Sequence, residues 1–262
     1  MSKINMEAIK AIAVEAGNKI LEVYGKEDFQ VETKDDNSPL TIADSLAHKA
    51  IVAGIEKLDI GYPILSEEGD PGDFEARKDW HTFWCVDPLD GTKEFVKRNG
   101  EFTVNIALIE GKYPTMGVIY VPVKETLYFA DANGAYKQVK QEKPEKLQVQ
   151  GRSENLIGVG SRSHASEIEQ KVLEMFSVTD SISRGSSLKF CMVAEGKADV
   201  YFRKNPTMEW DTAAGQAIVE GAGGTVLNKA NQRFDYNKEV LRNDSFLCLA
   251  YTSTNKPWNE FD

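Results

Sequence analysis

The stretch Phe83-Trp84-Cys85-Val86, followed by Asp87-Pro88-Leu89-Asp90-Gly91-Thr92, decides how this chain folds. The first four residues are typical of a buried strand, and Pro88 prevents that strand from continuing as a central member of a hydrogen-bonded ladder. Asp87 is therefore predicted at a strand end. The following Asp90-Gly91-Thr92 is suited to turn the backbone and open a short helix, so one turn can offer carboxylates to metal ions and amides to phosphate. Taken alone, these residues are also ordinary turn formers.

The composition favours a folded protein with an acidic surface. The chain has 262 residues, 41% of them hydrophobic, which is enough for a large core in one long domain or two short ones. Its 31 Lys and Arg residues face 41 Asp and Glu residues, giving a formal net charge of -10. This charge argues against nonspecific binding to nucleic acid or anionic lipid. The negative charge also repels phosphate esters. At any site that binds a phosphate ester, bound cations or a local basic patch must therefore make the electrostatic potential positive.

The cysteine pattern and the absence of long apolar runs favour the cytoplasm. Cys85, Cys191 and Cys248 are odd in number and far apart, and each lies in an apolar stretch, so we expect buried reduced thiols. No apolar run reaches the roughly 18 residues of a membrane span, and the N-terminus lacks the apolar core of a signal peptide. We therefore expect a cytoplasmic protein without a transmembrane segment. Peripheral association with the cytoplasmic face of the inner membrane stays open.

The segments around the opening stretch predict two helices and a meander. Apolar residues recur at helical spacing from Ile9 to Tyr24, and a second helix is expected to begin near 41–44 with Asp44 in its first turn. Membrane docking is the alternative for the first helix, but the mixed charges of its polar face disfavour it. An antiparallel meander is predicted from β-rich runs at 83–86, 103–109, 116–121 and 126–130, with turns at 110–112 and 133–134.

The residues after the meander predict a second domain. Lys, Gln and Glu dominate residues 137–155, which separate two differently patterned halves. We place the boundary at 150, between an N-terminal α+β metal-binding domain (1–150) and a C-terminal α/β substrate-binding domain (151–262). The second half is expected to form a helix-covered mixed sheet. Its predicted strands are 156–160, 178–183, 198–202 and 246–251, and its predicted helices are 166–176, 187–196 and 211–221.

Two further acidic clusters occur at the ends of predicted elements. Ser66-Glu67-Glu68-Gly69 follows the apolar strand 62–65, and Asp211 in Trp210-Asp211-Thr212-Ala213-Ala214-Gly215 lies where a helix starts. Each alone has a plain explanation, as a solvated loop or a helix cap. Together with the opening stretch they suggest one crevice, where several carboxylates can coexist only if their pKa values rise or cations neutralise them. Oxygen-only ligands favour magnesium over zinc, and none of the three histidines, His48, His81 and His164, lies in these motifs.

The three motifs in this order resemble those of the inositol monophosphatase superfamily. That family couples a Glu-Glu element, an Asp-Pro-Ile/Leu-Asp-Gly-Thr element and a later Trp-Asp-x-Ala-Ala-Gly element, and the agreement spans about residues 38 to 224. Within it, the segments Asp90-Gly91-Thr92-Lys93-Glu94-Phe95 through Lys97–Thr103 and Gly185–Cys191 resemble the bacterial CysQ branch, the 3'(2'),5'-bisphosphate nucleotidases. Inositol phosphatases usually have Thr-Asn-Phe where Lys93-Glu94-Phe95 stands here. The resemblance implies a layered αβαβα sandwich of the sugar-phosphatase type.

The resemblance also implies a metal centre and a water-activating pair. Glu67, Asp87 and the Leu89 carbonyl would hold one Mg²⁺, and Asp87, Asp90 and Asp211 a second, with Asp87 bridging; the family implies two such ions, or three, per site. Thr92 would orient the nucleophilic water and relay to Asp44, with Glu67 assisting. Gly91 and Thr92 would add backbone donors. Inhibition by lithium is also implied.

The substrate is expected to contact the metal centre and a basic wall from the second half. The substrate-binding residues that we expect are Glu67, Leu89, Asp90, Gly91, Thr92, His164, Ser186, Lys189, Arg203 and Asp211. Arg162 and Arg184 are further candidates for the wall. Each basic residue is equally compatible with an ordinary solvated charge. Ser186 and Lys189 are the candidates for holding a second phosphate.

The reading that follows is a Mg²⁺-dependent phosphomonoesterase that hydrolyses adenosine 3',5'-bisphosphate to AMP and phosphate, with the sulfated relative PAPS as a second substrate, in sulfate assimilation. The expected binding partner is a small phosphate ester, and nucleic-acid binding is not expected. The oligomeric state stays open. Two alternatives are kept. One is a phosphatase of the same fold acting on inositol phosphate or fructose 1,6-bisphosphate. The other is a non-catalytic, metal-dependent nucleotide sensor.

Overall fold

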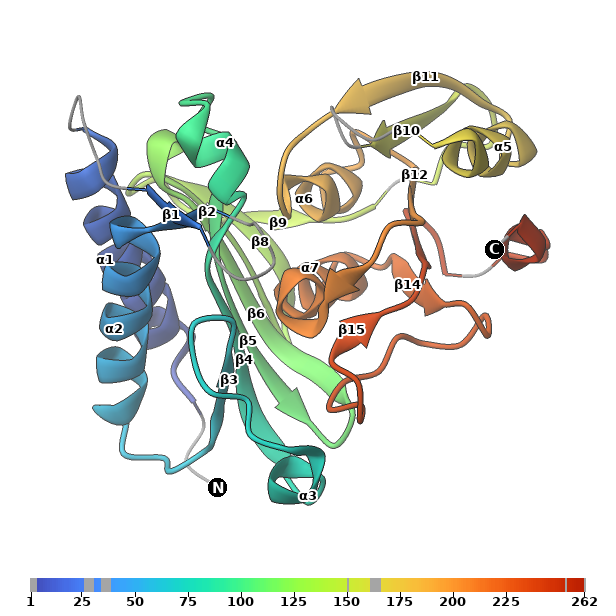
Figure 1. Cartoon of the computed structure of the whole chain (residues 1–262). Helices are drawn as coiled ribbons and strands as arrows, with labels where there is room; N and C mark the ends of the chain where they lie inside the picture. Colours follow the sequence, from blue (N-terminus) through green and yellow to red (C-terminus); the bar gives the residue numbers. More distant parts are fainter. Residues whose placement is uncertain are drawn as a thin grey trace.

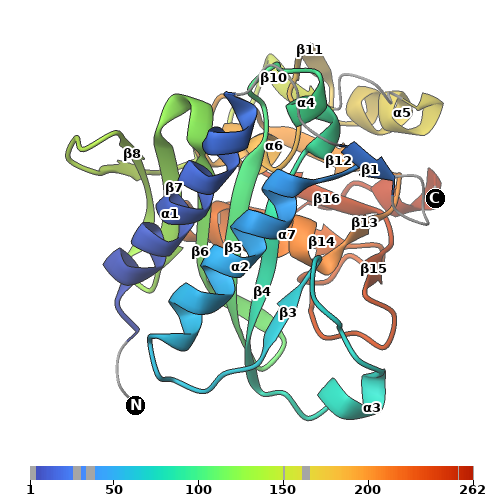
Figure 2. The same ribbon diagram turned by 60° about the vertical axis from the view of Figure 1, so that its left-hand side comes forward.

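The structure is a computed structural model that describes residues 4–25, 31–33, 39–149, 151–160, 166–252 and 254–261. Two long helices form its first layer, α1 (Met6–Tyr24) and α2 (Ile42–Glu56), which lie side by side on one face of a large sheet (Figures 1 and 2). Asn5 caps α1 by accepting a hydrogen bond from the Glu7 amide at 3.1 Å. The predicted apolar stripe of α1 is buried in the core from Ile9 to Val23, so it is not available for membrane docking.

The second layer is a seven-stranded sheet with the order β3-β4-β5-β6-β7-β8-β9. Its strands are β3 (Ile64–Ser66), β4 (Thr82–Asp90), β5 (Thr103–Glu110), β6 (Tyr113–Val121), β7 (Thr126–Asp131), β8 (Gly134–Val139) and β9 (Glu145–Leu147). All neighbours from β4 to β9 pair antiparallel, which confirms the predicted meander, while β3 pairs parallel with β4. Strands β8 and β9 were not predicted from the sequence, because polar residues dominate them where one face meets solvent.

The strand that carries the opening stretch is longer than predicted. β4 was expected to end at Val86 but continues to Asp90, paired with β5 on one side only after its pairing with β3 ends at Val86. The pairing shifts register between Asp87 and Asp90, so Pro88 sits in the irregular segment where no ladder amide is needed. Gly91 follows with φ of 92° and opens the short helix α4 (Thr92–Val96), as predicted.

The second half of the described chain forms a five-stranded mixed sheet in the order β11-β10-β12-β16-β14. Its strands are β10 (Leu156–Gly160), β11 (Val178–Ser183), β12 (Val200–Arg203), β14 (Thr225–Asn228) and β16 (Phe246–Leu249). Helices α6 (Leu188–Ala194) and α7 (Glu209–Gly221) lie between the two sheets, and α5 (Glu167–Met175) covers the outer face (Figure 1). The layers are therefore α1/α2, sheet, α6/α7, sheet, α5, as expected for the αβαβα sandwich.

Short elements that were not predicted from the sequence complete the described structure. They are β1 (Val31–Thr33), β2 (Pro39–Thr41), α3 (Phe74–Arg77), η1 (Pro122–Lys124), β13 (Thr207–Met208), β15 (Arg242–Asn243) and η2 (Trp258–Phe261). β14 was also missed. No helix within the described residues is both long enough and apolar enough to span a membrane.

One helix of the second half packs on the sheet of the first. A side-chain carbon added at Gly117 in β6 would lie 2.7 Å from the Ala214 carbonyl oxygen, so glycine allows α7 to approach the strand closely. The core between the sheets joins Phe83 and Ile119 from the first half to Phe190 and Trp210 from the second. The proposed boundary at 150 stays a prediction. The packing of α7 on the large sheet places the first turn of α7 over the end of β4.

Candidate active site

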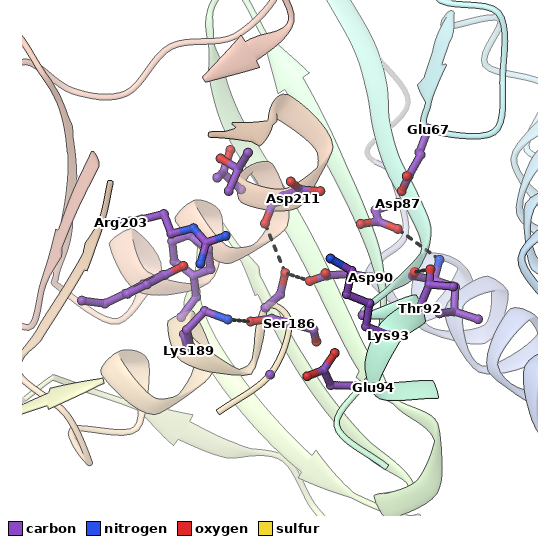
Figure 3. A pocket seen from close by; sticks show the side chains of 18 of the residues that line it. Glu67, Asp87, Asp90, Thr92, Lys93, Glu94, Ser186, Lys189, Arg203 and Asp211 are labelled. Carbon is purple, nitrogen blue, oxygen red and sulfur yellow. Dashed lines mark hydrogen bonds between the residues drawn. The ribbon is translucent and has the colours of Figure 1, made fainter. Parts of the chain in front are cut away.

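Acidic side chains from three elements meet at one end of the large sheet (Figure 3). β3 and β4 are parallel neighbours, and the Glu67 amide donates to the Val86 carbonyl at 3.2 Å, which places Glu67 beside Asp87. Asp211 enters from the first turn of α7, where its carboxylate accepts the Met208 amide at 2.8 Å. Carboxylate oxygens of Glu67, Asp87 and Asp211 lie within 4.8 Å of one another. The structure thus brings together the acids that the sequence placed at separate element ends.

Asp90 points into the same space and is held by a polar network that spans the two halves. The Ser187 hydroxyl donates to Asp90 Oδ2 at 2.6 Å and lies 3.1 Å from the Asp211 carbonyl oxygen. Asn105 Nδ2 donates to the Ser187 hydroxyl at 2.9 Å, and Thr103 donates to Asn105 Oδ1 at 2.9 Å. The sequence analysis missed Asn105 and Ser187. The available signal was the polar Asn105 between the apolar residues Val104 and Ile106 of the predicted strand 103–109, since a buried amide needs partners.

The electrostatics of this cluster fit a divalent cation. Burial raises the pKa of Asp87 well above its usual value, and the charges of Glu67, Asp90, Asp211 and Asp44 raise it further. Burial, followed by the charge of Asp90, raises the pKa of Asp211 to about 8. Four acids in one crevice destabilise each other when ionised, and a hard cation relieves that cost through oxygen ligands alone. The donor set therefore fits Mg²⁺.

Metal-free protein is expected to lose stability as the pH rises. An acid whose pKa is raised on folding holds its proton more tightly in the folded state, so its contribution to stability is complete below about pH 4 and is lost as the pH rises through the folded pKa, about 8 for Asp211. The melting temperature of metal-free protein should fall between pH 5 and 8.5, and added Mg²⁺ should restore it most at pH 8.5. Thermal denaturation scans test this, and a melting temperature that rises across this range without metal would contradict it.

The predicted water-activating residues lie around the same end of β4. The Thr92 hydroxyl donates to the Leu89 carbonyl oxygen at 3.4 Å, and the Leu89 amide donates to Asp87 Oδ1 at 3.1 Å. Asp44 is 1% exposed in the first turn of α2 and is close enough to add to the electrostatic shift at Asp87. The left-handed backbone at Gly91 favours glycine, and a side-chain carbon there would also lie in a tight contact, 3.1 Å from Ser186 Cβ.

A cavity of about 430 Å³ joins the acids to three of the expected substrate-side residues. Ser186, Lys189 and Arg203 line it opposite the acidic cluster (Figure 3). Lys189 is 7% exposed, and its ammonium donates to the Ser186 carbonyl oxygen at 2.6 Å. Burial lowers the pKa of Lys189 to about 8, against the opposing charge of Asp90. Arg203 donates through Nε to the Asn205 carbonyl at 3.2 Å, which leaves its two terminal nitrogens for a ligand.

The basic residues that line the cavity are not all those predicted from the sequence. Arg184 does not line this cavity but a different one, because it precedes the turn at Ser186-Ser187. Arg162 and His164 lie outside the described residues. The wall gains Lys93 and Lys97 from around α4, and its floor contains aromatic residues that were not predicted as site residues. These aromatic side chains, Phe190, Tyr201 and Phe246, contact one another at centroid distances of 5.2 to 5.6 Å.

The three cysteines are buried and not disulfide-bonded, as predicted. The acidic cluster includes none of them and no histidine. Burial raises the thiol pKa values of Cys85, Cys191 and Cys248 well above the usual value, so these groups remain protonated and unreactive. The metal-binding candidates within the described chain are therefore oxygen donors.

The sequence matches known proteins over nearly its whole length. Residues 1–256 match the model of the inositol monophosphatase family. The 3'(2'),5'-bisphosphate nucleotidase CysQ of Salmonella typhimurium is 43% identical over 248 residues, which is 94% of this chain and 100% of that protein. The relative of the same name from Haemophilus influenzae is 32% identical over 249 residues, 94% of this chain and 92% of that protein.

Solved structures share the fold. The crystal structure of CysQ from Bacteroides thetaiotaomicron, a bacterial member of the inositol monophosphatase family, superposes with a TM-score of 0.82 at 46% identity, covering 93% of this chain and 96% of that one. The extragenic suppressor protein suhB from Bartonella henselae gives a TM-score of 0.74 at 26% identity, covering 93% of this chain and 92% of that chain. The sandwich described above is therefore the fold of these proteins.

Proposed function

Because the chain belongs to the inositol monophosphatase family, we propose that it is a Mg²⁺-dependent phosphomonoesterase that hydrolyses adenosine 3',5'-bisphosphate to AMP and phosphate. The sulfated relative PAPS is included as a second substrate, which connects the reaction with sulfate assimilation. The observation that carries the proposal is one cavity in which the cluster of Glu67, Asp87, Asp90 and Asp211 faces Lys189 and Arg203. The name of the CysQ relatives supplies the substrate class.

The acids in the cavity are proposed as metal ligands in two overlapping sets. Glu67, Asp87 and the Leu89 carbonyl form one set, and Asp87, Asp90 and Asp211 form the other, with Asp87 common to both. When bound, the Mg²⁺ ions neutralise phosphate oxygens, activate water and stabilise the departing alkoxide. The number of ions, two or three, belongs to the proposal. Support comes from the oxygen-only donor set and from the raised pKa values of Asp87 and Asp211, which ionised neighbours and burial cause and a cation relieves.

Residues of the chain would then position the reacting groups. Thr92 orients the attacking water through its hydroxyl and passes a proton toward Asp44, while Glu67 assists from the metal-ligand side. The water oxygen bonds to phosphorus as the ester P–O bond breaks. The departing nucleoside oxygen takes up a proton from solvent water, and the proton accepted by Asp44 returns to solvent. The backbone amides of Gly91 and Thr92 face the transferred phosphate. No covalent enzyme intermediate is needed.

The other phosphate of the nucleotide would be bound by the opposite wall. Lys189 and Arg203 supply positive charge and Ser186 supplies a hydroxyl, and His164 remains a predicted contributor from outside the described residues. Arg203 has two terminal nitrogens in a planar fork, which suits a phosphate group. The three buried reduced cysteines support the proposed cytoplasmic location. Peripheral membrane association remains a prediction.

Replacing Thr92 by valine is expected to lower kcat by about 100-fold with little change in KM. Valine has nearly the same shape but cannot orient water or transfer a proton, and positioned proton transfer contributes roughly 10²–10⁴-fold in enzymes. Thr92→Ser keeps the hydroxyl and is the matched control, so it should retain most of the activity. Steady-state kinetics with adenosine 3',5'-bisphosphate measure both variants. A fully active Thr92→Val would remove Thr92 from the mechanism.

Removing metal separates the proposed enzyme from a nucleotide sensor. Phosphate release from adenosine 3',5'-bisphosphate in the presence of Mg²⁺ should fall by about 100-fold when EDTA is added and should return with excess Mg²⁺. AMP and phosphate should form in equal amounts. Bisphosphate binding without any phosphate release would instead identify a sensor, and release that is indifferent to EDTA would contradict the metal-dependent mechanism.

A further inference from the structure

A second cavity, of about 440 Å³, has five basic residues in its lining and a single acidic one among the described residues. Its lining comes from both halves of the chain, with residues from η1, β7 and β8 on one side and from the ends of β11 and α6 on the other. The basic residues that line it are Lys124, Lys137, Arg152, Arg184 and Lys197. It shares no lining residue with the acidic cavity described above. The two cavities are therefore separate sites within the described chain.

Only part of this positive charge is balanced by buried acids. Glu195 is the one carboxylate among the described lining residues; its side chain is 7% exposed and accepts hydrogen bonds from Lys137 at 2.9 Å and Lys197 at 2.7 Å. Arg152 pairs at 2.7 Å with Asp199, whose side chain is fully buried behind the lining. Five cations thus face two carboxylates. This surplus is opposite in sign to the chain as a whole, whose formal net charge is -10.

The two remaining cations, Lys124 and Arg184, have no carboxylate partner among the described residues. Among the residues that the structure describes, no carboxylate lies within 4.0 Å of the side-chain nitrogens of Lys124 or Arg184. Lys124 is exposed on η1, whereas Arg184 is half-buried and uses Nη1 to donate to the Ser183 carbonyl at 2.7 Å. That contact orients the guanidinium and leaves other N–H donors in its planar fork available. A fixed fork beside several ammonium groups is suited to an anion with three or more oxygens.

We propose that this cavity, formed by Lys124, Lys137, Arg152, Arg184 and Lys197, binds a phosphate or sulfate group, either as the free ion or on a small molecule. Its volume lies within the roughly 300–1,000 Å³ of small-molecule sites, and its surplus of positive charge favours an anionic ligand. The site is distinct from the proposed catalytic cavity. It is also built at the other end of the same helix: α6 follows Ser187 of the acidic cavity and ends next to Glu195 of the basic one.

The test uses full-length, metal-free protein, in which the crowded acids of the catalytic cavity disfavour anion binding. Amide NMR spectra would be recorded while sodium sulfate, inorganic phosphate or 5'-AMP is added at constant ionic strength. Saturable shifts are expected at Lys124, Arg184 and Lys197, with Kd below about 10 mM for at least one of the three probes. AMP binding at least tenfold more tightly than both ions would identify a nucleotide-borne group, and similar affinities would identify the free oxyanion.

The deciding variant is the double substitution Lys124→Gln with Arg184→Gln, which removes the two cations that lack carboxylate partners and leaves the buried ion pairs intact. It should weaken binding of the same probe by about tenfold or more. The matched control is Lys143→Gln with Arg242→Gln, which removes the same charge from exposed positions elsewhere and should leave Kd within about twofold. Absence of saturation with all three probes, or an unchanged Kd in the Lys124/Arg184 variant, would overturn the proposal.

Discussion

Asp87→Asn is expected to lower kcat/KM for adenosine 3',5'-bisphosphate by about 10³-fold or more while raising the melting temperature of the metal-free protein at pH 8. The two effects have one origin. Asp87 is 1% exposed and its pKa is raised by burial and by the charges of Glu67, Asp90 and Asp211. A neutral amide of the same shape removes that repulsion. It also removes the one ligand that both proposed metal positions would share.

The expected sizes of the loss of kcat/KM and of the rise in melting temperature follow from the negative charge that Asp87→Asn removes. Losing several kcal/mol of transition-state stabilisation lowers the rate by about tenfold for every 1.4 kcal/mol. Relief of about 1 kcal/mol of repulsion in the metal-free state would raise the melting temperature by about 2–4 °C for a chain of this size. Steady-state kinetics and thermal scans on the same preparation measure both.

The matched control is Asp79→Asn, an acid that is exposed and lies outside the cavity lining. It should leave kcat/KM and melting temperature nearly unchanged. An Asp87→Asn variant that keeps near-normal activity would remove Asp87 from the metal centre. A variant that loses activity and also melts at a lower temperature would indicate that the side chain serves mainly to hold the fold.

Much of this arrangement follows from local sequence. Alternating β-rich runs separated by Gly111 and by Asn133-Gly134 predict the meander because hairpin turns fix antiparallel neighbours. The apolar stripe from Ile9 to Val23 predicts the helix that packs on the sheet formed by this meander. The acids were placed at element ends because Asp87 and the segment Ser66-Glu67 follow apolar runs and Asp211 begins a helical pattern.

Other features depend on packing that local patterns do not carry. The continuation of β4 past Val86 results from pairing with β5 on one side, which tolerates Pro88 through a shift in register. The support of Asp90 by Ser187 and Asn105 joins residues more than 80 positions apart. Arg184 and Lys189 are neighbouring basic residues in the sequence, yet they lie on either side of the turn at Ser186-Ser187 and line different cavities. Outer strands such as β9 lack an apolar run because one face meets solvent.

Selectivity for a bisphosphate is the second large effect that we expect. Lys189 is buried and hydrogen-bonded to backbone carbonyls, and Arg203 keeps its terminal nitrogens available for a ligand in the same cavity. A monophosphate with only neutral hydroxyls therefore gives these two cations no anionic partner. Sites built for a charged or hydrogen-bonding group reject analogues that lack it strongly, because buried polar groups are left unpaired. We expect kcat/KM for adenosine 3',5'-bisphosphate to exceed that for inositol 1-phosphate by about 10³-fold.

The substitution Arg203→Gln tests whether the basic wall of the cavity causes this preference for the bisphosphate. The substitution removes the charge but keeps a polar side chain, so kcat/KM for the bisphosphate should fall by about tenfold or more while that for inositol 1-phosphate changes little. The ratio between the substrates should shrink accordingly. An equal loss of kcat/KM with both substrates would indicate that Arg203 maintains the structure of the cavity and does not bind the second phosphate.

The most direct test of the proposed function is kcat/KM measured at one Mg²⁺ concentration for adenosine 3',5'-bisphosphate, PAPS, inositol 1-phosphate and fructose 1,6-bisphosphate. The two adenosine nucleotides should be hydrolysed most efficiently, with adenosine 3',5'-bisphosphate exceeding inositol 1-phosphate by about 10³-fold. Higher efficiency with inositol 1-phosphate or fructose 1,6-bisphosphate would contradict the account and assign the same metal centre to a different phosphate ester.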